Sequence, residues 1–326
     1  MTIPLSAPLA ADAAWPALPA DSWGQTLATF HRWTQVVGKI RMGQGPWHNH
    51  SWGVPLYVTA AGFGTSLVPY GHGGFEIDFD LLRHRLEIRT TAGTSAGLQL
   101  HDGLSVAAFY ALVMDRMREL EMPVSIDPIP SEIPHAVPFD EDRHHASYVP
   151  DHAEALWRAM LGAHRVFGRF RAGYIGKASP VHLFWGSLDL AASRFSGRTA
   201  PPHPGGLPNF PLDVAREAYS HEVTSVGFWP GNEQAPEPIF YAYAYPSPAG
   251  YAEASVQPEA AYWLDELGEF VLPYDAVRRA DDPDATLLAF LESTHAAAAD
   301  LAGWDREALE LDHPAPHDWW RLRSSG

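Results

Sequence analysis

Residues 218–231 read AYSHEVTSVGFWPG and place two proton-transfer groups side by side, His221 and Glu222. An imidazole and a carboxylate serve as general acid and base, and both also ligate metal ions. If both residues lie within a strand, their side chains point to opposite faces of the sheet. If a short helix over 211–220 precedes the strand, the pair lies at a junction where the two side chains can converge. A His hydrogen-bonded in a sheet beside a solvated Glu is the structural alternative.

More residues with binding chemistry lie just before this stretch. His182 is a further candidate for acid–base or metal chemistry, and it is followed by Trp185, which is suited to wall a pocket. Arg194 and Arg198 flank a Ser/Gly turn, where their guanidinium groups could hold a carboxylate or phosphate of a ligand. Exposed arginines on a turn are the structural alternative.

Two more ligand-binding candidates come from turn and loop segments. His203 lies in a Pro/Gly-rich loop, residues 200–206, which is able to cover a pocket. Trp229 precedes a Pro-Gly turn and could form an aromatic wall beside it. An exposed loop histidine, and a Trp that anchors a turn on the core, are the alternatives.

Other motifs are weaker. The pair His48 and His50 in the string WHNH, and the pair His313 and His317, resemble metal-ligand spacings, but 17 histidines make chance pairs common. No HExxH, phosphate-binding loop, dinucleotide-binding GxGxxG or GxSxG pattern occurs. Three consecutive residues such as Ser220, His221 and Glu222 do not make a catalytic triad, whose members meet through hydrogen bonds.

Apolar periodicity predicts the elements that position these residues. We expect a helix around Leu27–Val37 with Ser22 as N-cap, one around Leu156–Phe167, one over 104–121, and one over 285–302 with Asp284 as N-cap. Alternating and β-branched runs predict strands at 55–60, 75–79, 86–91, 98–101, 223–228, 239–245 and 270–272.

The order of helix, antiparallel strands and helix occurs twice, which predicts an α+β fold of two pseudo-repeated units. GKIR at 38–41 followed by Trp52-Gly53 corresponds to GRFR at 168–171 followed by Trp185-Gly186. We expect a first unit at 1–126, a Pro-rich linker at 127–150, a second unit at 151–311 and a tail at 312–326. The units would share one long sheet or pack sheet against sheet.

Composition excludes several classes of protein. The 326 residues carry a net charge of −17, which disfavours nucleic-acid binding, and no cysteine is present for disulfides or thiolate chemistry. No apolar run is long enough for a membrane-spanning helix, and the N-terminus lacks the features of a secretory signal. We therefore expect a cytoplasmic protein without membrane partners.

Several long strings carry a resemblance to a known family. VHLFWGSLDLAASRFSGR at 181–198, the 218–231 segment, FYAYAYPSP at 240–248 and GEFVLPYDAVR at 268–278 appear in that order. Together with GKIRMGQGPWHNHSWGVPLYV at 38–58, they resemble the DUF5996 family of bacterial and fungal proteins. The resemblance spans roughly residues 15–304 and implies no activity, because the family has no assigned function.

Three functions are compatible with these residues. The leading hypothesis is an enzyme acting on a small anionic molecule by acid–base or metal-assisted chemistry, with His182, His221 and Glu222 as catalytic groups. A non-catalytic small-molecule-binding protein is the second hypothesis. The third is a protein-interaction module that uses the linker or the tail with Trp319-Trp320. The identity of any cofactor or metal, and the oligomeric state, stay open.

Overall fold

The computed structural model describes residues 14–18, 20–232 and 234–311. The tail, with His313, His317, Trp319 and Trp320, lies outside the described residues. The fold is of the mixed α+β kind expected from the sequence, with two antiparallel sheets.

The first half of the chain begins with a long helix and closes with another. The strands between them form a sheet in the order β1-β2-β4-β5-β6, and β3 pairs with β4. The elements are α2 (Ala20–Gln44), the 3-10 turn η1 (Asn49–Ser51), β1 (Tyr57–Val58), β2 (Gly62–Gly64), β3 (Val68–Tyr70), β4 (Gly73–Asp80), β5 (Arg85–Thr90), β6 (Ser95–Gln99) and α3 (Val106–Glu119).

The second half contains the longest strands of the described residues. Its sheet has the order β11-β12-β10-β9-β8-β7. The elements are α4 (Pro150–Ala172), β7 (His182–Phe184), β8 (Asp189–Thr199), α5 (Leu212–Ala218), β9 (His221–Trp229), β10 (Ile239–Tyr245), β11 (Tyr262–Leu264), β12 (Glu269–Pro273), α6 (Tyr274–Arg278), α7 (Pro283–Leu301) and α8 (Arg306–Leu309).

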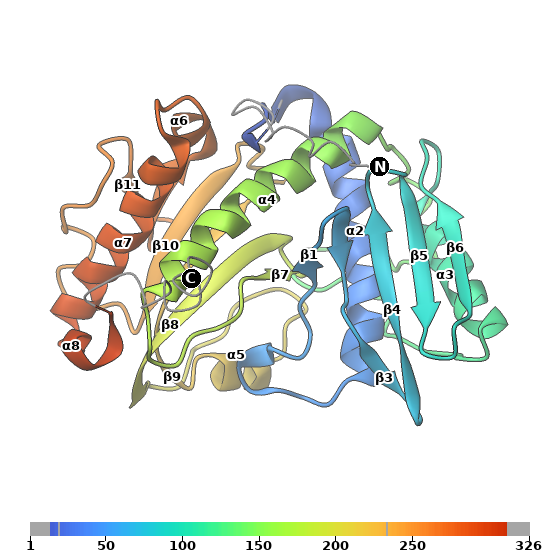
Figure 1. Ribbon diagram of the computed structural model, residues 1–326, viewed down its shortest axis with the longest axis horizontal. Coiled ribbons are helices and arrows are strands. Elements are labelled where there is room, and N and C mark those ends of the chain that lie inside the picture. The colour runs from blue at the N-terminus through green and yellow to red at the C-terminus, as the bar shows by residue number, and fades with distance from the viewer. Residues whose placement is uncertain (1–13, 19, 233, 312–326) are drawn as a thin grey trace, which may run out of the picture.

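The two sheets meet edge to edge. The backbone N–H of Leu56 donates to the carbonyl of Leu183 over 2.9 Å, and the N–H of Leu183 donates back over 2.8 Å. Figure 1 shows β1 and β7 lying next to each other at this point. The sheets are thus joined by one isolated bridge, which is closer to a shared sheet than to sheets packed face to face.

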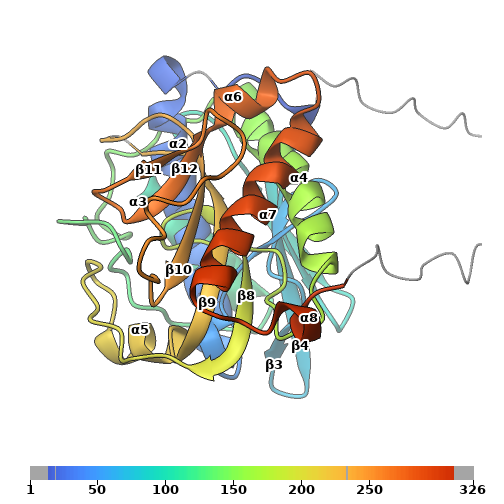
Figure 2. The same ribbon diagram turned by 90° about the vertical axis from the view of Figure 1, so that its left-hand side faces the viewer.

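Helices cover the second sheet on one face. Helix α4 crosses β8, and α7 packs on β9 and β10 (Figures 1 and 2). Even-numbered side chains of β9 point toward these helices, since Thr224 contacts His295 of α7. We call this side of the sheet the helix face. The odd-numbered side chains lie on the opposite face, which we call the open face because neither α4 nor α7 covers it.

One hydrophobic cluster runs through both halves. It includes Trp33 and Phe109 from the first half and Phe170 and Phe290 from the second. Burial of such large apolar side chains is the main favourable term in folding. The core is therefore shared across the junction of the sheets.

The helices lie where the apolar periodicities predicted them, but two of the predicted N-cap residues are wrong. Helix α3 begins after Ser105, whose side chain accepts the N–H of Ala108. Asp282 caps α7 by accepting the N–H of Ala285, so the expectation that Asp284 is the cap is wrong. Asp284 lies one position past the N-terminal Pro283 and accepts hydrogen bonds from more distant side chains. Ser22 lies inside α2 and is not its N-cap.

The strands confirm most of the predicted runs. Strand β10 spans residues 239–245 as predicted, and β4, β5, β9 and β12 each overlap their predicted ranges. Strand β6 begins at Ser95, three residues before the predicted start, because Glu87 to Arg89 of β5 pair with residues 95–97. The internal duplication stays a prediction.

The segment between α3 and α4 contains no helix or strand. It is nevertheless held to both halves, because Gln35 of α2 hydrogen-bonds the backbone of Ser131 and the carboxylate of Glu132 accepts the hydroxyl proton of Ser187. The division at 127–150 stays a prediction. Within the described ranges, no helix is long and apolar enough to cross a membrane.

Candidate functional site

The structure separates His221 from Glu222. Helix α5 precedes them, as one sequence interpretation required, but β9 already begins at His221, so the two side chains point to opposite faces. The His221 ring lies 5.9 Å from the His50 ring on the open face. Glu222 lies on the helix face, where its carboxylate accepts hydrogen bonds from Ser196 and Arg198 at 2.9 and 2.7 Å. The arrangement is the one predicted for two neighbours within a strand, and the convergence that the alternative allowed does not occur.

Both arginines have partners within the protein. Arg194 is buried, stacks 3.4 Å from the centroid of the Phe170 ring and pairs with Glu292 at 3.3 Å. Arg198 pairs with Glu222 and donates to two backbone carbonyls at the end of α7. Cations are favourable at a helix C-terminus, where carbonyls lack helical partners. A ligand anion would compete with these contacts, and the binding role of both arginines stays a prediction.

His203 and Trp229 lie on the open face among tyrosines. The His203 ring stacks on Tyr219 with 4.4 Å between centroids, and the hydroxyls of Tyr219 and Tyr243 are hydrogen bonded at 2.8 Å. The Trp229 indole N–H donates to the carbonyl of Ser187 over 3.2 Å. The structure thus brings His203, His221 and Trp229 to one face of the second sheet. Their functions stay predictions.

Two carboxyl groups of the open face titrate near neutral pH. Asp189 accepts the hydroxyl proton of Tyr241, and burial raises the pKa of Asp189 to about 7. Burial and the nearby charge of Asp189 raise the pKa of Glu269 to about 7 as well. Both side chains retain partial exposure. Groups with such pKa values can hold or release a proton at physiological pH.

His182 and Trp185 lie at the junction of the two halves. His182 is fully buried and neither ring nitrogen has a hydrogen-bond partner within the described residues. Burial lowers the pKa of His182 to about 3, so its imidazole is neutral. The Trp185 ring packs against Gly38 of α2 and donates its indole N–H to the carbonyl of Val54 over 2.9 Å.

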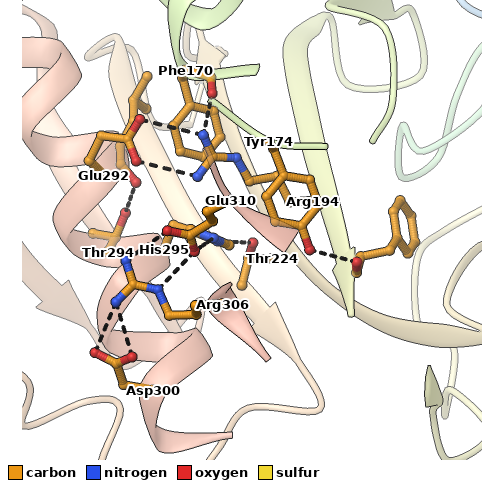
Figure 3. Close-up of polar contacts among 12 residues, drawn as sticks. Phe170, Tyr174, Arg194, Thr224, Glu292, Thr294, His295, Asp300, Arg306 and Glu310 are labelled. Carbon is orange, nitrogen blue, oxygen red and sulfur yellow. Dashed lines mark hydrogen bonds and ion pairs between the residues drawn. The ribbon is translucent and has the colours of Figure 1, made fainter. Parts of the chain in front are cut away.

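A hydrogen-bonded chain that the sequence did not reveal lies on the helix face (Figure 3). The Thr224 hydroxyl lies 2.7 Å from Nδ1 of His295, and Nε2 of His295 lies 3.1 Å from the Glu310 carboxylate. Since a carboxylate can only accept, His295 donates through Nε2 and accepts the Thr224 proton at Nδ1. This is the order of hydroxyl, imidazole and carboxylate in a catalytic triad.

Local electrostatics fix the protonation states of this chain. Burial, partly offset by the hydrogen bond to Glu310, lowers the pKa of His295 to about 4. Burial alone would raise the pKa of the Glu310 carboxyl, but hydrogen bonds from His295 and Arg306 outweigh it and lower that pKa to about 2. At neutral pH the imidazole is therefore neutral and the carboxylate is ionised, as a base and its orienting group require.

A cavity of about 190 Å³ adjoins the chain. Thr224 and Glu222 line it together with Trp304, whose buried indole N–H has no hydrogen-bond partner within the described residues. The other lining residues are mostly apolar: Val223, Ala244, Tyr245, Pro246, Pro248, Ala298 and Ala302. Thr224, Glu222 and Trp304 thus stand among otherwise mostly apolar cavity walls.

Metal ligation is less well supported by the geometry. In the part of the chain that the structure describes, no three side chains of His, Cys, Asp or Glu are grouped to hold a metal ion. Zinc sites in proteins generally use at least three protein ligands.

Comparison with known proteins identifies the family. The model of DUF5996, described as a family of unknown function, matches residues 15–311. The chain belongs to the DUF5996 family. The match confirms the resemblance inferred from the sequence strings. No curated protein and no solved structure matches this DUF5996 protein. Its function must therefore be argued from its own residues.

Proposed function

We propose that this DUF5996 protein is an enzyme that transfers or hydrolyses the acyl group of a small molecule in the cavity beside Thr224. The observation that carries the proposal is the continuous chain from Thr224 through His295 to Glu310, together with the position of Thr224 in the wall of that cavity. Acid–base chemistry by a His and a Glu is retained from the sequence hypothesis, with different residues.

Each residue has a distinct role in the proposed reaction. The Thr224 oxygen attacks the acyl carbon while its proton passes to Nδ1 of His295, and Glu310 stabilises the resulting imidazolium. His295 then returns the proton to the leaving group, and water releases the acyl group from Thr224.

The cavity also bears on the class of substrate. Among the described residues that line it, Glu222 is the only charged one, and neither Arg194 nor Arg198 lines it. A neutral or cationic acyl compound fits these walls better than the anionic molecule that the two arginines suggested. The volume restricts the substrate to a small molecule.

The test is the hydrolysis of p-nitrophenyl acetate, a small neutral ester, by the full chain. We expect Thr224→Val and His295→Gln each to lower kcat/KM by about 10³-fold or more. The reason is that removing one member of a catalytic unit can cost about as much activity as removing the whole unit. Thr294→Val is the matched control. Thr294 is also buried, but its hydroxyl donates only to backbone carbonyls of its own helix and does not line the cavity.

The outcomes separate catalysis from binding. An ester-hydrolysis rate that survives Thr224→Val in a folded protein would contradict the proposal. No turnover, together with saturable binding of acetyl esters that are recovered unchanged, would support the non-catalytic binding function instead. Thermal unfolding of every variant verifies that lost activity is not lost structure.

A further inference from the structure

A second group of reactive side chains gathers on the open face, at the corner where η1 approaches α5. We call it the Lys177 corner, and it consists of His50, Trp52, Lys177, Phe195 and Glu217. The backbone of His50 has a φ of +57°, a left-handed conformation that is unfavourable for a residue with a side chain. The Glu217 carboxylate holds this turn by accepting the N–H of His50 over 2.9 and 3.0 Å.

The hydrogen bonds of His50 define which ring nitrogen is available to accept a proton. Nδ1 lies 2.8 Å from the carbonyl of Ala218, so this nitrogen carries the proton and donates it. Nε2 therefore has a free lone pair, and the amino group of Lys177 lies within hydrogen-bonding distance of it. Burial also lowers the pKa of His50, so the ring is neutral beside the lysine.

The lysine itself has an unusual environment. Its nitrogen lies 5.4 Å from the centroid of the Trp52 ring and 5.1 Å from that of Phe195. The chain contains only two lysines, Lys39 and Lys177. Lys39 is buried and donates to the carbonyl of Ile129, whereas Lys177 is exposed. Lys177 is thus the one lysine that a molecule in solution can reach.

We propose that Lys177 is a reactive amine that condenses with a small aldehyde or ketone to form a Schiff base, with His50 as its proton-transfer partner. The site is independent of the proposed acyl transfer, because Phe195 lies on the open face and Thr224 on the helix face. The rings of Trp52 and Phe195 favour a carbonyl compound with an apolar or aromatic group.

The reaction balances with groups that the corner supplies. The ammonium of Lys177 gives a proton to Nε2 of His50, and the resulting amine attacks the carbonyl carbon. The nitrogen then passes one of its two remaining protons to the carbonyl oxygen, which gives a neutral carbinolamine. The hydroxyl leaves as water with the proton returned by His50, and the imine remains protonated on nitrogen. One amine and one carbonyl thus yield one imine and one water, without an oxidant or reductant.

The test measures reductive trapping at Lys177. The full chain is treated near neutral pH with benzaldehyde and cyanoborohydride, and the modified residues are mapped by peptide mass spectrometry. We expect Lys177 to be labelled about 10²-fold faster than Nα-acetyl-lysine amide in the same mixture, since a positioned base accelerates such steps by this order. Lys177→Arg should abolish the label, and Lys39→Arg should leave it unchanged.

Replacing the proton-transfer partner supplies the decisive variant. His50→Asn removes the imidazole but keeps a side chain that tolerates the left-handed backbone, so the turn should survive. We expect its Lys177 to react at the rate of the free amine. Equal labelling of wild type and His50→Asn, or a wild-type rate no higher than that of the free amine, would overturn the proposal. Thr224→Val should not alter labelling, so the two proposals fail independently.

Discussion

At the scale of single residues, the protonation of His295 controls whether Thr224 has a base. Its pKa is lowered by burial to about 4, so the neutral ring persists above that pH and is lost below it. We expect the ester-hydrolysis rate to be constant from neutral pH down to about pH 5 and to fall below about pH 4. A pH–rate profile checks this. An acid limb with a midpoint near 6.5, the ordinary value for His, would show that His295 is not the base.

The raised pKa of Asp189 predicts that the stability of the folded protein falls as the pH rises. Burial raises its pKa in the folded protein from 3.8 to about 7, so the folded state holds a proton that the unfolded state has released. This contribution is fully present below about pH 4 and is lost as the pH rises through 7. We expect Asp189→Asn to increase the free energy of unfolding relative to wild type at about pH 8.

Urea denaturation at two pH values measures this effect. Below about pH 4 the advantage of Asp189→Asn should vanish, because Asp189 is protonated in both states there and an Asn oxygen can still accept the Tyr241 hydroxyl. A variant with the same advantage at both pH values would contradict the assigned pKa.

At the scale of elements, two of the three glycines in α2 have very different surroundings. A Cβ at Gly38 would lie 2.2 Å from the nearest atom of the Trp185 ring, whereas a Cβ at Gly24 meets nothing within 4 Å. Trp185 is buried and held by its hydrogen bond to Val54, so it cannot move aside cheaply. We expect Gly38→Ala to destabilise the protein by about 1–3 kcal/mol.

Gly24→Ala is the matched substitution in the same helix. It should stabilise the protein by about 0.4–1 kcal/mol, because it reduces the entropy of the unfolded chain without a clash. Thermal unfolding of both variants gives the comparison. If the two variants were equally stable, the close approach of Trp185 to α2 would not contribute to the packing of the two halves.

At the scale of the whole molecule, the shared core predicts cooperative unfolding. The two sheets meet at Leu56 and Leu183, and the Trp157 indole N–H of α4 donates to the carbonyl of Thr59 in the first half. Near the N-terminus, the Trp15 indole N–H donates to Asp284 of α7. We expect one calorimetric transition for the full chain, with equal calorimetric and van't Hoff enthalpies.

A fragment that contains only the second half of the chain should not fold. A chain of residues 151–311 would expose the faces of Trp185 and Leu183 that α2 and the Leu56 segment cover. Circular dichroism and calorimetry of this fragment check the expectation. Two separated transitions in the full chain, or a folded fragment, would show instead that the halves are independent domains.

The sequence by itself determined the features that depend on local pattern. Apolar periodicity was sufficient for α3 and α4, and alternation was sufficient for β10, because each pattern is set by residues within one element. Family membership was also readable from the strings of 181–278. The cap of α7 shows the limit of such signals, since Asp282 and Asp284 are chemically alike and two positions apart.

Only the tertiary structure decided which functional groups meet. Strand β9 starts at His221, so the alternation of side chains sends His221 and Glu222 to opposite faces. Thr224 and His295 are 71 positions apart and meet because α7 packs on the helix face of β9. The Lys177 corner likewise joins residues of both halves. Such contacts between distant segments depend on the packing of whole elements, which no local pattern in the sequence encodes.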